Sequence, residues 1–162
     1  TSIYRVKMAI RGKFRTGKFI PSNPEKYIGN LKEITWRSSW ELKFMRWCDL
    51  NPSVVPWNSE GLHIPYYSQA DQKMRKYHVD FVIRYKTPEG EIKTSLIEIK
   101  PDSQTRPPSK KGRKKPETYL AECHTYQVNM DKWRHAEAWA KKNDADFRVL
   151  TEYDLGIARK RE

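Results

Sequence analysis

Apolar and polar positions alternate most clearly in the middle of the chain. Between residues 74 and 86 the apolar or aromatic set falls at Tyr77, Val79, Phe81, Ile83 and Tyr85. This period of two is typical of a half-buried strand, so the pattern predicts one strand over residues 74–86 and a second over 91–100. The intervening Thr-Pro-Glu-Gly at residues 87–90 fits a three-residue hairpin loop with a bulge at the glycine.

Helical spacing is found on both sides of this hairpin. Ser38 with Glu41 three residues later makes a capping box, which predicts that a helix begins there. A longer helix is predicted from about Glu117 to Lys142, where apolar residues recur at helical spacing. Residues 61–67 and 146–152 are predicted as strands, residues 51–60 as a turn and connector, and the chain end as a turn or short helix. This order indicates a mixed α/β domain.

Length and composition favour a single folded domain. The 162 residues are 37% hydrophobic and 12% aromatic, which is enough large apolar surface for a core. We expect the folded domain over residues 36–155. Residues 1–35 are expected to form a basic N-terminal arm that lies on the domain or reaches a partner, and residues 156–162 a basic tail.

Charge adds the expectation of a polyanionic partner. Lys and Arg number 32 against 20 Asp and Glu, a formal net charge of +12. Nucleic acid is favoured over an anionic membrane surface or an acidic protein. No apolar run has the length of a membrane span and the start lacks the core of a signal peptide, so we expect an intracellular protein without a membrane partner. Cys48 and Cys123 stand alone, which indicates neither a disulfide framework nor a zinc site.

Two carboxylates occupy positions where a buried strand would carry apolar side chains. The hairpin loop pairs Thr87 with Glu91, and counting back along both strands puts Asp80 opposite Glu98, with Cβ atoms about 5 Å apart. Lys100 lies on the same face, two residues past Glu98. Because facing like charges repel, either a cation must lie between the two carboxylates or one of them must hold a proton. A divalent metal bound by both fits the distance, and Mg²⁺ prefers an oxygen site of this kind. The alternative is a solvated strand face on which Lys100 neutralises Glu98.

Glu41 adds a third acid. On a helical projection it falls inside the arc formed by the apolar residues of its helix, where an unpaired charge is costly. Its capping-box position supplies a purely structural explanation. Both explanations stay open on the residues alone.

A family resemblance rests on these residues and on longer strings. Val-Asp-Phe at 79–81, followed by Ile-Glu-Ile-Lys at 97–100, resembles the PD-(D/E)XK signature of restriction-endonuclease-like nucleases, with Val79 in place of the first proline. The strings at 23–30, 36–57, 64–68, 77–83, 96–101 and 148–155 resemble the head completion nuclease family of large contractile-tailed phages. Transposon end-cleaving endonucleases and Holliday-junction resolvases are more distant resemblances.

The resemblance implies a fold, a chemistry and a setting. It implies a restriction-endonuclease-like core with a mixed sheet flanked by helices, and a metal-dependent deoxyribonuclease. The cofactor would be Mg²⁺, with Mn²⁺ as a substitute, and no small-molecule cofactor is expected. Asp80, Glu98, the carbonyl of Ile99 and Glu41 would hold the metal, and Lys100 would position the attacking water.

Partners follow from the same resemblance and from the charge. We expect double-stranded DNA, together with the portal or other head completion proteins, in the virion and in the host cytoplasm during assembly. The residues expected to contact DNA are Arg37, His78, Lys110, Lys111, Arg113, Lys114 and Lys115. A second basic patch comprises Arg11, Lys13, Arg15 and Lys18.

Two other classes of protein fit part of this pattern. A catalytically silent head completion protein could bind DNA or the portal and keep the nuclease fold as a scaffold. A basic nucleic-acid-binding module unrelated to nucleases would leave the facing acids unexplained.

Overall fold

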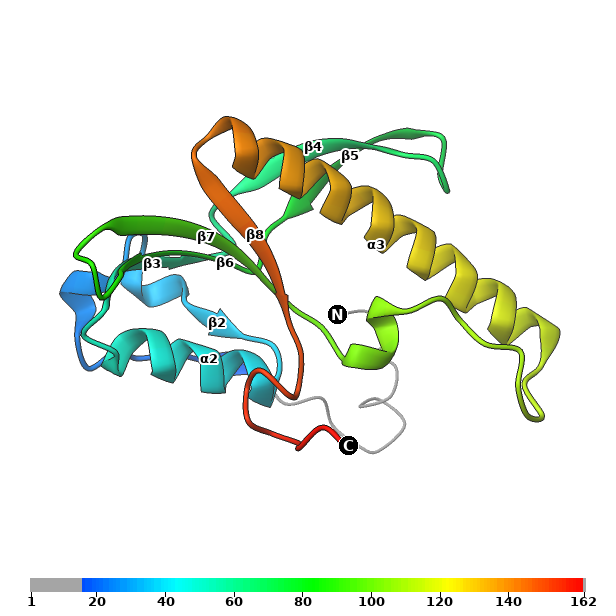
Figure 1. Ribbon diagram of the computed structural model, residues 1–162, viewed down its shortest axis with the longest axis horizontal. Coiled ribbons are helices and arrows are strands. Elements are labelled where there is room, and N and C mark those ends of the chain that lie inside the picture. Colours follow the sequence, from blue (N-terminus) through cyan, green and yellow to red (C-terminus); the bar gives the residue numbers. More distant parts are fainter. Residues whose placement is uncertain (1–15, 162) are drawn as a thin grey trace.

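A four-stranded sheet forms the centre of the molecule (Figure 1). The computed structural model describes residues 16–161. The strands are β3 (Val54–Ser59), β6 (Phe81–Lys86), β7 (Ile92–Ile99) and β8 (Ala145–Leu150), in the spatial order β3-β6-β7-β8. β6 pairs antiparallel with both β3 and β7, whereas β8 pairs parallel with β7. The expected mixed α/β architecture is confirmed.

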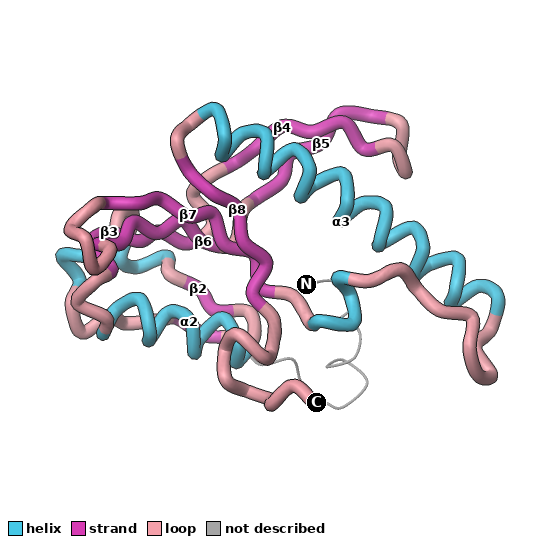
Figure 2. The backbone as a smooth tube through the Cα atoms, viewed as in Figure 1, coloured by secondary structure: helices cyan, strands magenta, loops and turns pink. Residues whose placement is uncertain are grey.

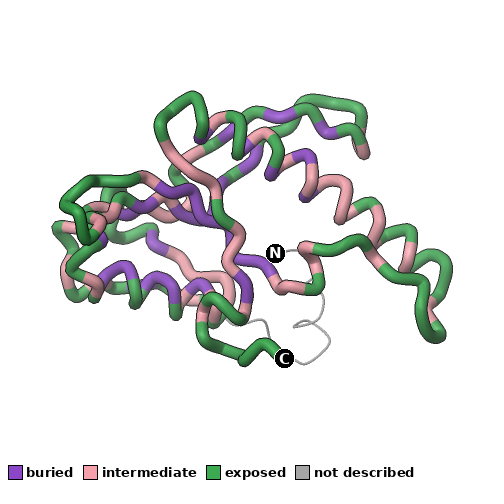
Figure 3. Tube along the Cα trace, viewed as in Figure 1, coloured by how far each residue is buried: buried purple, intermediate pink, exposed green. Residues whose placement is uncertain are grey.

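A different apolar layer covers each face of this sheet. Helix α2 (Ser39–Leu50) packs Phe44 and Met45 against Phe81 and Ile97 on one face. Helix α3 (Pro116–Lys142) packs on the other face, where its apolar residues join Leu96. The sheet therefore alternates its side chains between two cores. Figure 3 shows the buried positions gathered around β6 and β7 and the start of α3 exposed.

An antiparallel ribbon stands apart from the sheet and lies along α3 (Figure 2). It consists of β4 (His63–Ser68) and β5 (Lys73–His78), which pair only with each other. Ile64, Tyr66 and Tyr77 from this ribbon pack in the same core as Trp133 and Ala136 of α3. The ribbon thus closes one side of the region that leads to Asp80.

The predicted hairpin has the predicted register. Phe81 pairs with Ile97 and Lys86 with Ile92. The Thr87 N–H donates to the Glu91 carbonyl at 2.8 Å and the Gly90 N–H to the Thr87 carbonyl at 2.9 Å. Gly90 has a positive φ of 85°, which a bulge glycine supplies without strain.

Two expectations about the strands were wrong. The single strand expected over 74–86 is two strands, because the chain leaves the ribbon after His78 and enters the sheet at Phe81. Residues 51–60, expected as a connector, contain the edge strand β3. Pro56 lies within its register shift between Val54 and Trp57, a place where a missing N–H is tolerated. The chain end, residues 151–161, forms turns without a helix.

Residues 16–35 pack on the domain. They contain the short strands β1 (Gly17–Lys18) and β2 (Thr35–Trp36), the 3₁₀ turns η1 (Pro24–Lys26) and η2 (Leu31–Glu33), and core residues Phe19 and Ile34. Lys18 donates to Thr35 Oγ1 at 2.9 Å, while Arg11, Lys13 and Arg15 lie outside the described residues. Within residues 16–161, no helix has the length and apolar character needed to cross a membrane.

Candidate active site

Four charged side chains converge where the sheet meets α2 and α3. Asp80 precedes β6, Glu98 and Lys100 lie at the end of β7, and Glu41 is in the first turn of α2. They are 9%, 4%, 4% and 5% exposed, respectively. Burying charge at this density costs several kcal/mol per unpaired ion, about as much as the net stability of many domains. A purely solvated strand face is therefore excluded.

The hairpin register places Asp80 opposite Glu98, as the sequence predicts. The last paired residues are Phe81 and Ile97, and Asp80 and Glu98 are one step further along the two chains. The Ile99 N–H donates to Asp80 Oδ2 at 2.9 Å, which fixes that carboxylate against β7. Lys100 Nζ lies 3.4 Å from Glu98 Oε1.

Burial and repulsion from neighbouring carboxylates raise the pKa of Asp80. Burial is the largest cause and raises this pKa well above the ordinary value, and the carboxylates of Glu98 and Glu41 raise it further. The Ile99 N–H and the Lys100 ammonium act in the opposite direction without cancelling the effect. The fold therefore disfavours the ionised form of Asp80, and a perturbed acid of this kind is typical of a functional site.

Glu41 forms the helix cap and is also electrostatically coupled to the other buried carboxylates. Ser38 Oγ accepts the Glu41 N–H at 3.1 Å, so the helix cap forms, but the returning carboxylate bond goes to the N–H of Arg37, at 2.6 Å, in place of Ser38. Burial raises the pKa of Glu41, and repulsion from Glu60 and Glu98 adds to it. The cap thus holds a carboxylate that is electrostatically coupled to the Asp80 site.

Tyr77 orients Glu98 and was not foreseen. Its hydroxyl donates to Glu98 Oε2 at 2.6 Å within the buried region. Burial and the neighbouring Glu98 carboxylate raise the pKa of this phenol, so it remains a donor. Sequence reasoning placed Tyr77 only in the apolar alternation of a strand, because alternation reports burial and says nothing of what a hydroxyl reaches.

Lys132 on α3 is a second unforeseen residue, and it brings a further cation to the site. Its Nζ lies 5.7 Å from the centre of the Tyr77 ring. Burial lowers the pKa of this ammonium, Glu98 and Asp80 raise it, and Lys100 lowers it. Lys132 therefore lies within electrostatic reach of the site. Its signal in the sequence is its spacing, since it precedes the buried Ala136 by four residues on the packed face of α3.

The predicted DNA contacts come from three different parts of the chain. Arg37 is held by Glu60 through two hydrogen bonds of 2.8 and 3.1 Å. His78 is exposed on the ribbon, with its ring centre 4.1 Å from that of His63, and burial and His63 lower its pKa. The basic loop at 110–115 lies at the far end of α3 (Figure 1), although it follows Lys100 closely in sequence.

The loop cations differ in how they are paired. Lys114 Nζ lies 2.7 Å from Glu122 Oε2 and donates to the Ser109 carbonyl at 2.7 Å. Lys110 lies over the Tyr119 ring at 5.0 Å. Lys111, Arg113 and Lys115 are exposed, and none of them forms an ion pair with another described residue.

The donor set fits a hard divalent cation. Asp80 and Glu98 present carboxylate oxygens beside the backbone of Ile99, and a bound cation would relieve their repulsion. Among residues 16–161, no three Asp, Glu, His or Cys side chains are gathered as a ready metal-binding group. The arrangement thus suits a two-carboxylate site in which water supplies further ligands, with the predicted contact from Glu41 still untested.

Comparison with known proteins places the chain in a family. Residues 51–152 match the family model described as TnsA-like endonuclease N terminal. The chain belongs to this endonuclease family. Asp80, Glu98 and Lys100 lie inside the matched residues, and Glu41 lies before them. The restriction-endonuclease-like fold expected from the sequence is confirmed for this TnsA-like endonuclease.

A curated relative supports the longer resemblance. The head completion nuclease of Enterobacteria phage T4 is 41% identical over 143 residues, which cover 86% of this TnsA-like endonuclease and 93% of the relative. The expected membership of the head completion nuclease family is therefore confirmed. No solved structure matches the chain.

Proposed function

We propose that this protein is a phage head completion nuclease that hydrolyses phosphodiester bonds in double-stranded DNA with the help of Mg²⁺. The observation that carries the proposal is the buried cluster at the end of β7, where Asp80, Glu98 and Glu41 surround a site that also contains Lys100. Such a cluster is costly in a scaffold and useful in a phosphodiesterase.

Each residue has a role that follows from its position. Asp80 and Glu98, with the carbonyl of Ile99, would hold Mg²⁺ or its substitute Mn²⁺, and Glu41 would contact it directly or through water. Bound there, the cation supplies a Lewis acid and lowers the pKa of a coordinated water. Tyr77 keeps Glu98 oriented through its 2.6 Å hydrogen bond.

The two lysines would act on the phosphate. Lys100 Nζ, 3.4 Å from Glu98 Oε1, is placed to orient the attacking water and to stabilise the negative charge that develops on the phosphoryl oxygens. Lys132 approaches the same carboxylates from α3 and would bind a non-bridging phosphate oxygen. The phosphate would thus meet cations from both the sheet and the helix.

The biological setting is proposed from family membership. The protein would act on DNA at the head during or after genome packaging, in contact with the portal or other head completion proteins. It would be found in the host cytoplasm during assembly and then at the portal vertex of the virion. Charge complementarity supports the DNA partner, since the chain has a formal net charge of +12.

The decisive experiment measures cleavage of supercoiled and linear DNA in Mg²⁺ and in chelator. We expect nicking of the supercoiled form in Mg²⁺ alone, with Asp80→Asn inactive and Asp131→Asn active as a matched control. Cleavage of linear DNA without nicking of circles would replace the endonuclease with an end-trimming enzyme. A folded wild-type protein that binds DNA but cleaves neither substrate would instead be the silent structural protein.

A further inference from the structure

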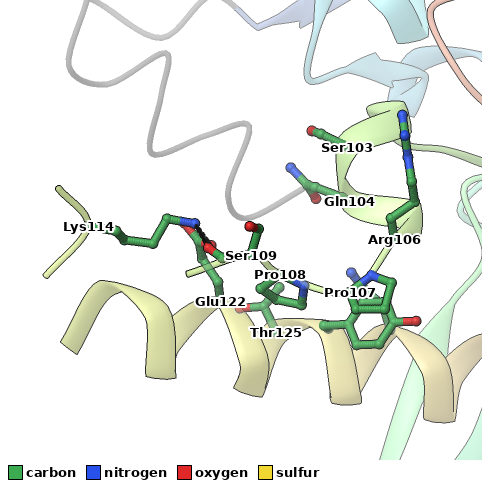
Figure 4. Close-up of a pocket in the computed structure, with 11 residues that line it drawn as sticks. Ser103, Gln104, Arg106, Pro107, Pro108, Ser109, Lys114, Glu122 and Thr125 are labelled. Atoms are coloured by element: carbon green, nitrogen blue, oxygen red, sulfur yellow. Dashed lines mark hydrogen bonds and ion pairs between the residues drawn. The ribbon is translucent and has the colours of Figure 1, made fainter. Parts of the chain in front are cut away.

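One pocket is lined by none of the proposed catalytic residues and has no role in the mechanism above. It has a volume of about 510 Å³ and opens between α3 and the segment from η3 (Asp102–Thr105) to Lys114. Figure 4 shows Ser103 and Gln104 coming from η3, with Pro108 lying beside Thr125 of α3. This volume is within the range of small-ligand sites.

Two amide groups in the pocket wall lack partners. Asn129 of α3 is only 4% exposed, and its Nδ2 has no hydrogen-bond partner among the described residues. Gln104 comes from the opposite wall, and its buried Oε1 likewise has no partner within residues 16–161. An unmade buried hydrogen bond costs about 1–3 kcal/mol, so a donor and an acceptor left open in one pocket indicate a ligand that supplies both complements.

The rest of the lining fits a nucleotide. Pro107, Pro108 and Tyr126 supply flat apolar surfaces of the kind on which a base or sugar can lie. Arg106 and Lys114 supply cations for a phosphate, although Asp102 pairs with Arg106 and Glu122 with Lys114. An open donor and an open acceptor, apolar surfaces and nearby cations correspond to a base edge, a base face and a phosphate.

Both walls of the pocket continue, within a few residues along the chain, to lysines of the proposed site. Asn129 precedes Lys132 by three residues, so the two side chains are about one helical turn apart on neighbouring parts of one face. Gln104 follows Lys100 by four residues, through Pro101 and the first turn of η3. A strand whose phosphate lies at Lys100 and Lys132 can therefore place a neighbouring nucleotide in the pocket.

We propose that the pocket takes one unpaired nucleotide of the substrate strand, next to the scissile phosphate. The amides of Gln104 and Asn129 pair with the base edge. This inference rests on the proposed nuclease function and names its substrate class. A base inside a duplex must unstack before it can enter, whereas a base in a single-stranded extension need not. The protein therefore favours DNA with unpaired nucleotides over a fully paired duplex.

The test compares the affinity for two DNA probes in chelator, where no cleavage occurs. One probe is a blunt duplex, and the other is the same duplex with a three-nucleotide single-stranded extension. We expect the wild type to prefer the extension about tenfold, since a stacked, hydrogen-bonded base contributes on the order of 1–3 kcal/mol. Asn129→Leu and Gln104→Met should each bring this ratio close to one. Gln69→Met, which changes an exposed amide on the ribbon, serves as the control and should keep the wild-type ratio.

The outcomes separate the two proposals. A wild type without the preference, or pocket variants that retain it, would overturn the pocket assignment even if the protein cleaves DNA in Mg²⁺. A preference that is absent from both pocket variants, in a protein that never cleaves DNA, would support the pocket and overturn the nuclease. Folding is monitored by thermal unfolding, and Gln104→Met covers the case in which Asn129→Leu fails to fold, because Gln104 is only partly buried.

Discussion

Asp80 and Asp131 are both buried aspartates, yet their surroundings are opposite. Asp131, 2% exposed on α3, accepts the N–H of Gln69 at 2.9 Å and the Nε2–H of Gln127 at 3.1 Å, and Arg134 lies 3.6 Å away. Asp80, 9% exposed, accepts one N–H and is repelled by two other carboxylates. Asp131 connects the ribbon to α3. Within residues 16–161, Asp80 accepts only the Ile99 N–H, a hydrogen bond that the side-chain oxygen of an asparagine could also accept.

The difference shows how a structural acid and a functional acid are distinguished. Burial is common to both and therefore decides nothing. A structural acid is surrounded by donors, and its removal leaves those donors without partners. A functional acid is surrounded by like charge, and its neutralisation relieves strain that only a cation would otherwise relieve. Opposite effects on activity and stability are expected from the same Asp→Asn change.

The largest expected effect is on cleavage. Asp80→Asn removes a charge from the proposed metal site, so DNA cleavage in Mg²⁺ should fall by several orders of magnitude. Asp131→Asn should cleave at close to the wild-type rate per folded molecule. The measurement is the initial rate of plasmid nicking, corrected for the folded fraction. Equal reductions in the two variants would remove the distinction between the two acids.

Glu41→Gln tests the residue that combines both environments. The amide oxygen can still accept the Arg37 N–H, so the free energy of unfolding should change by at most about 1 kcal/mol. The missing charge should lower cleavage about 10–100-fold, as expected for a group that supports a metal site. A wild-type nicking rate in Mg²⁺ would assign Glu41 to the helix cap and leave a two-carboxylate site.

Asp131→Ala should give the largest decrease in stability. The change leaves the Gln69 N–H and the Gln127 amide without their acceptor, which costs about 1–3 kcal/mol. Urea denaturation in chelator measures the free energy of unfolding, with Asp80→Ala as the matched variant. If Asp131→Ala unfolds no more easily than Asp80→Ala, the bonds to the ribbon contribute nothing to stability.

A similar contrast exists among the loop cations. Replacing the three unpaired ones, Lys111, Arg113 and Lys115, with Gln should weaken DNA binding evenly across sequences. It should also reduce the slope of log affinity against log salt by about 0.9 for each phosphate that the loop no longer neutralises. Lys114→Gln alone should change the slope less, because Glu122 already neutralises that ammonium. An unchanged slope in the triple variant would assign the loop to a protein partner.

The smallest expected effect is a change in how stability depends on pH. In chelator the raised pKa of Asp80 makes the folded state bind more protons than the unfolded state between the two pKa values. Stability therefore falls as pH rises through that interval. Asp80→Asn should equal the wild type at a pH below both of these pKa values and exceed it at neutral pH. Parallel pH profiles for the two proteins would show that Asp80 titrates normally.

Local chemistry made part of this structure predictable. The Thr-Pro-Glu-Gly loop sets its own hairpin register, so the opposition of Asp80 and Glu98 could be counted from the turn. The cap of α2 follows from Ser38 in the same way. In both cases, interactions between residues close in sequence determine the local geometry, so no knowledge of distant contacts is needed to predict it.

The missed features depend on partners distant in sequence. Apolar alternation continues unbroken across Val79, although the chain there passes from the ribbon to the sheet, because alternation reports a buried face and not which strand lies alongside. Tyr77 and Lys132 gained their roles only when α3 and the ribbon packed together. Nearness in sequence also gave a wrong expectation of nearness in space. The basic loop follows Lys100 closely along the chain, but it lies at the start of α3, whereas Lys132 lies in the second half of that helix.

The distance between the basic loop and the proposed site sets the length of DNA that could contact both. Lys115 and Lys132 are 17 residues apart along α3, a rise of about 25 Å. At about 3.4 Å per base pair, this distance corresponds to about seven base pairs of duplex. A DNA molecule held by the loop and by Lys132 would be contacted on one side of the cut only. A DNA terminus closer to the proposed site than this length would be bound without the help of the loop.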